Sequence, residues 1–184
     1  PALQTFSQFG SRALGNNSTM SDGLTDILKY GGIVAGVVDA NIIMTVDGYV
    51  STLSNPFDTW TYGYSVIFNV NRFLNALNEN KAKFGAEAEK FEAEARFFRA
   101  FVSFMIMRSH ASEADNLGLI IRPDLGSMDA TLKSKSRANL SDSWDYIEND
   151  LKYCTEGERL PKTAIAGRVT YYAAQALMAR AMLY

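Results

Sequence analysis

Residue types that could do chemistry are sparse in this 184-residue sequence. His110 is the only histidine and Cys154 the only cysteine, so the chain cannot supply a two-histidine or a cysteine-built metal site. No Gly-x-Ser-x-Gly motif marks a nucleophile. Gly31 and Gly36 have the spacing of a phosphate-binding loop, but Val37 stands where that loop needs lysine. We therefore predict a protein that is not an enzyme and that uses no cofactor or metal.

A binding surface is indicated instead by the loop predicted at residues 45–57. Tyr49 and Phe57 lie there among Gly, Asn and Asp residues, with no helical stripe that would bury their rings. An aromatic ring can cover the apolar face of a sugar while amide groups bond its hydroxyls. We predict a ligand surface from Tyr49, Asn55 and Phe57. Trp60 would form its helical edge, although Trp60 also fits an apolar core stripe, and the loop aromatics could simply pack onto the domain.

Charge and hydropathy exclude two further classes. The chain has 18 basic and 20 acidic residues and no basic cluster, so a surface that neutralises nucleic-acid phosphates is not expected. The longest apolar run, residues 31–38, is far shorter than the ~20 residues of a membrane-spanning helix.

Helical periodicity dominates from residue 24 onward and predicts an all-α protein. We treat residues 1–184 as a single helical domain whose lead-in, residues 1–23, is loosely ordered. The last helix reaches Tyr184 without a stop signal, which predicts that the chain is a fragment of a longer protein. Short connections favour antiparallel helix pairs. The expected helices cover residues 24–44, 57–79, 86–110, 141–154 and 169–184, with Ser141 as the cap of the fourth.

The helix at residues 86–110 is expected at the centre because it is apolar on nearly every side. Arg96 and Arg99 lie within it, and a charge in a packed interior requires a partner. Glu92, four residues before Arg96, is positioned to pair with it. The residues predicted to be buried in the core are Phe68, Leu74, Phe91, Phe98, Val102, Met105, Ile147 and Leu177.

Three segments together resemble the N-terminal half of the SusD/RagB family of outer-membrane nutrient-binding lipoproteins. The first is Trp60-x-x-x-Tyr64-x-x-Ile67-x-x-x-Asn71-x-x-Leu74. The second is Glu94-Ala95-Arg96-Phe97-Phe98-Arg99-Ala100-Phe101. The third joins Trp144-x-x-Ile147-x-x-Asp150-Leu151 to Gly167-Arg168-Val169-Thr170 and the alanine-rich run that ends at Tyr184. The order and spacing of these motifs cover residues 57–184.

This resemblance implies tetratricopeptide-like helix pairs that form the N-terminal part of a SusD-like fold. It implies a lipoprotein exposed on the outer-membrane surface, anchored through an N-terminal lipidated cysteine that is absent from this chain. The implied partners are a SusC-like TonB-dependent transporter and a glycan or other nutrient. A tetratricopeptide-like protein-interaction domain without a small-molecule ligand remains the alternative, although no 34-residue repeat is evident.

Overall fold

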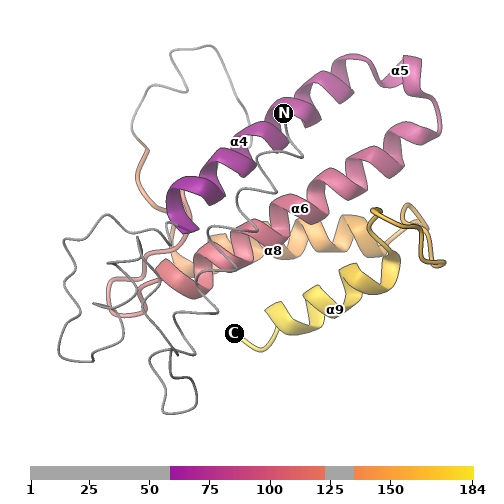
Figure 1. Ribbon diagram of the computed structural model, residues 1–184. Helices are drawn as coiled ribbons and strands as arrows, with labels where there is room; N and C mark the ends of the chain where they lie inside the picture. Colours follow the sequence, from indigo (N-terminus) through magenta and orange to yellow (C-terminus); the bar gives the residue numbers. More distant parts are fainter. Residues whose placement is uncertain (1–58, 123–134) are drawn as a thin grey trace, which may run out of the picture.

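The computed structural model describes residues 59–122 and 135–184, and the regular structure of this part of the chain is helical (Figure 1). An isolated bridge between Ser112 and Leu117 is the one β contact among these residues. The prediction of an all-α fold is therefore confirmed. The predicted lead-in and the predicted helix 24–44 lie outside the described residues. The helices are α4 (Thr59–Glu79), α5 (Lys81–Phe84), α6 (Glu87–His110), α8 (Leu140–Thr155) and α9 (Tyr171–Ala181).

Helix α6 is the central element of the described fold. It packs against α4 on one side and against α8 on the other, and α9 packs mainly on α8 (Figure 1). The short helix α5 reverses the chain between α4 and α6, so these two run antiparallel; α8 and α9 form a second antiparallel pair. This is the predicted tetratricopeptide-like arrangement, and it gives α6 neighbours on both sides.

Side-chain caps set the beginnings of α8 and α9. Asn139 precedes α8, and its Oδ1 accepts a hydrogen bond from the backbone N–H of Asp142 at 2.7 Å. The prediction that Ser141 caps this helix is wrong. Ser141 lies within α8, and Asn139 has the extended backbone and the side-chain acceptor that a cap requires. Thr170 caps α9 in the same way through the N–H of Ala173.

The buried core confirms part of the predicted set. Val102, Ile147 and Leu177 are buried, whereas the other predicted residues apart from Phe68 are only partly covered; these are Leu74, Phe91, Phe98 and Met105. The prediction that Phe68 is buried is wrong, since this residue is 42% exposed. It falls on the side of α4 opposite the buried positions Gly63, Val66 and Val70.

Small residues explain why the phenylalanines of α6 lie at the edges of the core. Ala93 and Ala100 are fully buried and let the neighbouring helices approach closely. On α4, a Cβ atom added to Gly63 would lie only 2.8 Å from Cδ1 of Ile106 on α6. Phe104 is the one phenylalanine of α6 that the helix packing encloses, with 1% exposure.

Replacing Phe104 by alanine should therefore reveal where the core lies. We expect Phe104→Ala to lower the free energy of unfolding by ~3–5 kcal/mol, because it removes a buried ring and leaves a cavity. Phe68→Ala makes the same chemical change at a site that is 42% exposed, and should cost less than about 1 kcal/mol. Urea denaturation followed by circular dichroism measures both variants. Equal shifts of the two midpoints would contradict the assignment of the core.

Candidate functional site

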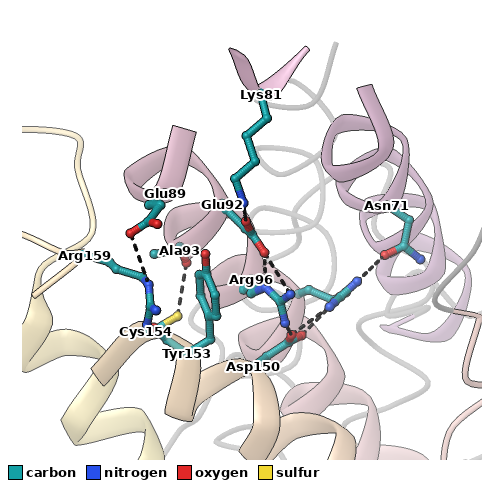
Figure 2. A network of polar contacts seen from close by, with 11 residues as sticks. Asn71, Lys81, Glu89, Glu92, Ala93, Arg96, Asp150, Tyr153, Cys154 and Arg159 are labelled. Carbon is teal, nitrogen blue, oxygen red and sulfur yellow. Dashed lines mark hydrogen bonds and ion pairs between the residues drawn. The ribbon is translucent and has the colours of Figure 1, made fainter. Parts of the chain in front are cut away.

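A buried ion pair between Arg99 and Asp150 joins α6 to α8. Nε of Arg99 donates to Oδ2 of Asp150, and Nη2 donates to Oδ1, both at 2.7 Å (Figure 2). Arg99 is 6% exposed and Asp150 is 2% exposed, so neither charge is solvated well enough to be stable alone. The parallel pair of hydrogen bonds fixes both the distance and the orientation of the two helices at this point.

Asn71 extends this contact to α4. Its Oδ1 accepts a hydrogen bond from Nη1 of Arg99 at 2.7 Å (Figure 2). Its Nδ2 donates to the backbone carbonyl of Arg122 at 2.6 Å. One amide therefore ties the buried arginine to the segment that follows α6, and the resulting chain of bonds links Asp150, Arg99, Asn71 and Arg122.

Arg96 forms the more exposed half of the same network. Its Nη2 donates to Oε1 of Glu92 at 2.8 Å, as the four-residue spacing predicted, and its Nη1 reaches Oδ1 of Asp150 at 3.2 Å. Its guanidinium also covers the ring of Tyr153 at 4.3 Å, and Arg159 covers the same ring at 4.1 Å. The predicted need of both arginines for partners is confirmed.

The titration properties follow from this packing. Burial alone would lower the pKa of Arg99, but the hydrogen bonds and charge of Asp150 outweigh it and raise the pKa above its ordinary value. Burial raises the pKa of Tyr146, whose ring lies beneath Arg99, to about 12. Burial also raises the pKa of Cys154 to about 12, and the negative charge of Asp150 adds to this effect. Near neutral pH, Tyr146 and Cys154 are protonated.

Removing one partner of the buried pair should be costly. We expect Asp150→Ala to lower the free energy of unfolding by ~3–5 kcal/mol, because it leaves the charge of Arg99 buried without its carboxylate. Glu148→Ala is the matched control on the same helix; it breaks a pair with Lys152 whose side chains are 36% and 46% exposed, and it should cost at most ~1 kcal/mol. Chemical denaturation tests both. Similar losses of unfolding free energy in the two variants would show that burial does not determine how much an ion pair contributes to stability here.

The network also predicts how stability depends on pH. Burial would raise the pKa of Glu92, but hydrogen bonds from Arg96 and Tyr153 and the charges of Arg96 and Lys81 together lower it below the ordinary value of 4.5. A carboxyl whose pKa is lowered by folding stabilises the protein above its unfolded pKa, and this contribution disappears as the pH falls through the folded pKa.

Glu92→Gln should therefore destabilise the protein most near neutral pH. We expect the difference in urea midpoint between wild type and Glu92→Gln to be full above pH ~5 and to shrink progressively below pH ~4. Denaturation curves recorded between pH 3 and pH 7 measure this difference. A difference that stays constant over the whole range would show that the charge of Glu92 contributes nothing.

A second cluster of side chains surrounds Trp60 at the beginning of α4. The indole lies edge-on to Tyr64 with ring centroids 4.8 Å apart, and edge-on to His110 at 5.4 Å. The guanidinium of Arg137 lies 5.2 Å from the centroid of the indole ring. Trp60 is partly exposed and is held by residues from α4, from the end of α6 and from the segment before α8. A ring fixed from three sides is a rigid platform with little conformational entropy to lose on binding.

Arg137 and Tyr64 also fix the segments next to this cluster. Arg137 donates to the carbonyl oxygens of His110, Leu117 and Gly118 at 2.6, 3.0 and 2.7 Å. The hydroxyl of Tyr64 accepts from the backbone N–H of Ile120 at 2.7 Å. Burial raises the pKa of Tyr64 above its ordinary value, so the hydroxyl stays neutral near neutral pH.

The chain segment that follows α6 and the segment that precedes α8 are hydrogen-bonded to each other. The N–H of Gly118 donates to the carbonyl of Ala138 at 2.7 Å, and the N–H of Ala138 donates to Leu119 at 2.6 Å. Nζ of Lys135 bonds to the carbonyl of Ile121. The described segments on the two sides of residues 123–134 are therefore joined to each other by hydrogen bonds.

The predicted ligand residues are placed only in part. Trp60 belongs to the aromatic cluster, whereas Tyr49, Asn55 and Phe57 lie outside the described residues, so their proposed role stays a prediction. The contributions of Tyr64 and Arg137 were missed. Tyr64 follows Trp60 by four residues, a spacing that fits an apolar core stripe equally well, while Arg137 gave no signal because it comes from a segment without periodicity.

Two general features of the described residues bear on function. Within residues 59–122 and 135–184, no group of three or more His, Cys, Asp or Glu side chains is arranged to hold a metal ion. None of the helices described there combines the length and the apolar character needed to cross a membrane.

Comparison with known proteins identifies relatives of this scaffold. Residues 17–183 match the profile of a SusD-like family described as "Starch-binding associating with outer membrane". A search of curated protein sequences gave no match. Among solved structures, a "Putative sugar binding protein" from Bacteroides vulgatus ATCC 8482 is 26% identical, with a TM-score of 0.57 over 68% of this chain and 29% of its own.

Two further solved structures share the fold. A SusD superfamily protein from Bacteroides thetaiotaomicron VPI-5482 is 18% identical, with a TM-score of 0.58 over 72% of this chain and 32% of its own. A SusD-like protein from Bacteroides fragilis NCTC 9343 is 23% identical, with a TM-score of 0.63 over 100% of this chain and 34% of its own. The chain thus spans about a third of the length of these relatives.

The antiparallel helix pairs, joined by a buried arginine–aspartate network, define a helical scaffold of the tetratricopeptide-like class. The match over residues 17–183 goes further: this chain belongs to the SusD-like family, a family of binding proteins associated with the outer membrane.

Proposed function

We propose that this chain forms part of a lipoprotein displayed on the bacterial cell surface that captures a glycan, or another nutrient, without changing it chemically. The captured nutrient would pass to a SusC-like TonB-dependent transporter. The observation that supports this proposal most directly is the family match over residues 17–183, whose description combines starch binding with the outer membrane. The sugar-binding description of the relative from Bacteroides vulgatus, at 26% identity, agrees with it.

The cluster around Trp60 supplies a physical reason to place part of the ligand surface at this end of α4. Trp60 is partly exposed, and its orientation is fixed by Tyr64, His110 and Arg137. Phe57 precedes Trp60 by three residues, so the chain can separate their Cα atoms by at most ~11 Å. Phe57 can therefore share one surface with Trp60, and aromatic rings with nearby amides suit a sugar.

The alternative is a helical protein-interaction domain that binds no small molecule. The helix pairs alone are equally compatible with it, since tetratricopeptide-like scaffolds serve many functions. Binding measurements on the full-length protein separate the two proposals. We expect isothermal titration calorimetry against soluble starch and a panel of other soluble polysaccharides to show binding of at least one, with the polysaccharide recovered uncut. If none binds while the transporter is still recognised, the interaction-domain proposal replaces nutrient capture.

The location of the ligand surface has its own test. The double variant Tyr49→Ala/Phe57→Ala in the full-length protein should weaken binding of the recognised glycan by about tenfold or more, because buried aromatic contacts dominate such interfaces. Its melting temperature should change by less than ~2 °C, since loop side chains that bind ligand contribute little to the core.

The matched control removes the same two residue types elsewhere. Phe84→Ala/Tyr172→Ala deletes one phenylalanine and one tyrosine that are 46% and 59% exposed on the described surface. It should leave the affinity unchanged. Wild-type affinity in the Tyr49→Ala/Phe57→Ala variant would exclude this loop as the site, while nutrient capture by another part of the protein would stand.

A further inference from the structure

Arg137 carries a positive charge that no described carboxylate neutralises. The ion pairs within residues 59–122 and 135–184 all involve other cations. The guanidinium instead donates to three backbone carbonyls, at distances of 2.6 to 3.0 Å. These dipoles satisfy hydrogen bonds but carry no net charge. Because Arg137 is only partly exposed, water compensates its charge incompletely, and a negatively charged partner is favoured.

Arg137 also has hydrogen-bond donors that the protein does not use. A guanidinium has five N–H groups, and the three carbonyls take the one on Nε and both on Nη2. Neither N–H on Nη1 donates to a described residue, yet Nη1 is not among the buried side-chain atoms of this part of the chain that lack a partner. Nη1 is therefore open to solvent. Since the guanidinium lies over the indole of Trp60, 5.2 Å from its centroid, this open edge adjoins the aromatic cluster.

Lys135 places a second cation next to Arg137. Both side chains reach the segment that follows α6: Nζ of Lys135 donates to the carbonyl of Ile121, and Nε of Arg137 donates to that of Gly118. Lys135 is exposed, and no described carboxylate pairs with it. Its ammonium has three N–H groups, so the bond to Ile121 leaves two of them available to a ligand.

Cations outnumber carboxylates at this end of the fold, where α6 ends and α4 and α8 begin (Figure 1). Residues 108–122 and 135–137 hold four cations and two carboxylates, although the whole chain has a net charge of -2. The cations are Arg108, Arg122, Lys135 and Arg137, and the carboxylates are Glu113 and Asp115. A local excess of positive charge attracts anionic ligands. Four cations suit the separated charges of a polysaccharide better than the continuous phosphates of a nucleic acid.

We propose, given the nutrient capture inferred above, that the glycan recognised at this surface is anionic. Its carboxylate or sulfate groups bind Nη1 of Arg137 and Nζ of Lys135 beside Trp60. Hydrogen bonds between ionised partners are stronger than those between neutral groups. Three carbonyls and the indole already hold Arg137 in place, so binding costs little side-chain entropy. Nε and Nη2 are occupied, so the acidic group bonds one nitrogen, unlike the two-nitrogen contact of Arg99 with Asp150.

Matched pairs of polysaccharides separate the effect of charge from that of the sugar backbone. Polygalacturonate and its highly methyl-esterified form share one backbone, as do dextran sulfate and dextran; the first pair tests carboxylates and the second tests sulfates. In isothermal titration calorimetry with the full-length protein, we expect the charged member of at least one pair to bind about tenfold more tightly than its neutral counterpart. This preference should shrink as sodium chloride is raised from about 0.05 M to about 0.5 M, because salt screens the charges.

The outcomes distinguish this inference from the proposed function. If the polysaccharides that bind, in these pairs or in the panel above, are neutral, the anionic ligand is excluded while nutrient capture stands. If charged and neutral members of each pair bind equally, the same conclusion holds. If no polysaccharide binds at all, nutrient capture itself fails and the anionic ligand is rejected with it.

Single substitutions locate the charges responsible. We expect Lys135→Gln to weaken binding of the charged polysaccharide about threefold, and to leave binding of the neutral counterpart unchanged. Lys83→Gln is the matched control: Lys83 is also exposed and bonds an uncharged oxygen, Oδ1 of Asn80 at 2.7 Å, but it lies on α5 at the other end of α4. Equal losses in the two variants would show a general effect of net charge and would overturn the proposal.

Arg137 needs two variants, because its bonds to three carbonyls also shape the surface. Arg137→Gln should reduce the preference for the charged polysaccharide about tenfold, whereas Arg137→Lys, which keeps the charge, should retain most of it. If both variants instead weaken charged and neutral polysaccharides alike, Arg137 acts only by positioning Trp60 and the proposal fails. Melting temperatures report whether these variants fold; if they do not, the comparison of Lys135→Gln with Lys83→Gln decides.

Discussion

The bidentate contact between Arg99 and Asp150 is the interaction on which the rest of the described structure depends. A guanidinium with 6% exposure is tolerable only if its hydrogen-bonding capacity is met from several directions. Asp150 meets it from α8 and Asn71 meets it from α4. Three helices must therefore adopt one mutual register, which apolar packing alone would specify less strictly. Such a network adds orientation more than it adds net stability, because desolvation of the charges offsets much of their attraction.

The network also gives a physical meaning to the motifs that resemble the SusD/RagB family. Asn71 belongs to the first motif, Arg99 to the second and Asp150 to the third, although they are separated by 28 and 51 residues along the chain. The motifs occur together because their polar members bond to one another in the folded protein. The ordered set of individually weak motifs therefore corresponds to a single contact among three helices.

Sequence periodicity was sufficient to predict the four long helices of the described residues, because burying one face of each helix requires apolar residues at regular intervals. It did not predict α5, which has only four residues and is too short to show a period. The need of Arg99 for a partner could also be predicted, but Asp150 could not be chosen from among the acidic residues without the fold. Phe68 was misassigned because its spacing fits a stripe, and the close approach at Gly63 turned a different side of α4 inward. Of the predicted ligand surface, Trp60 alone is described. Arg137, which covers it, comes from a segment whose position depends on tertiary contacts and has no periodic signal.

The hydrogen-bonded segments on the two sides of residues 123–134 have a consequence for how this protein tolerates changes in chain length. Asn71 holds the carbonyl of Arg122, and backbone bonds join Gly118 and Leu119 to Ala138 before α8 begins. The ends of the intervening stretch are thus fixed by the scaffold whatever lies between them. Once the ends of a loop are held together, doubling its length costs only ~0.6 kcal/mol of closure entropy. Lengthening the chain at this place should therefore cost little in folding free energy, because the scaffold already holds the two ends together.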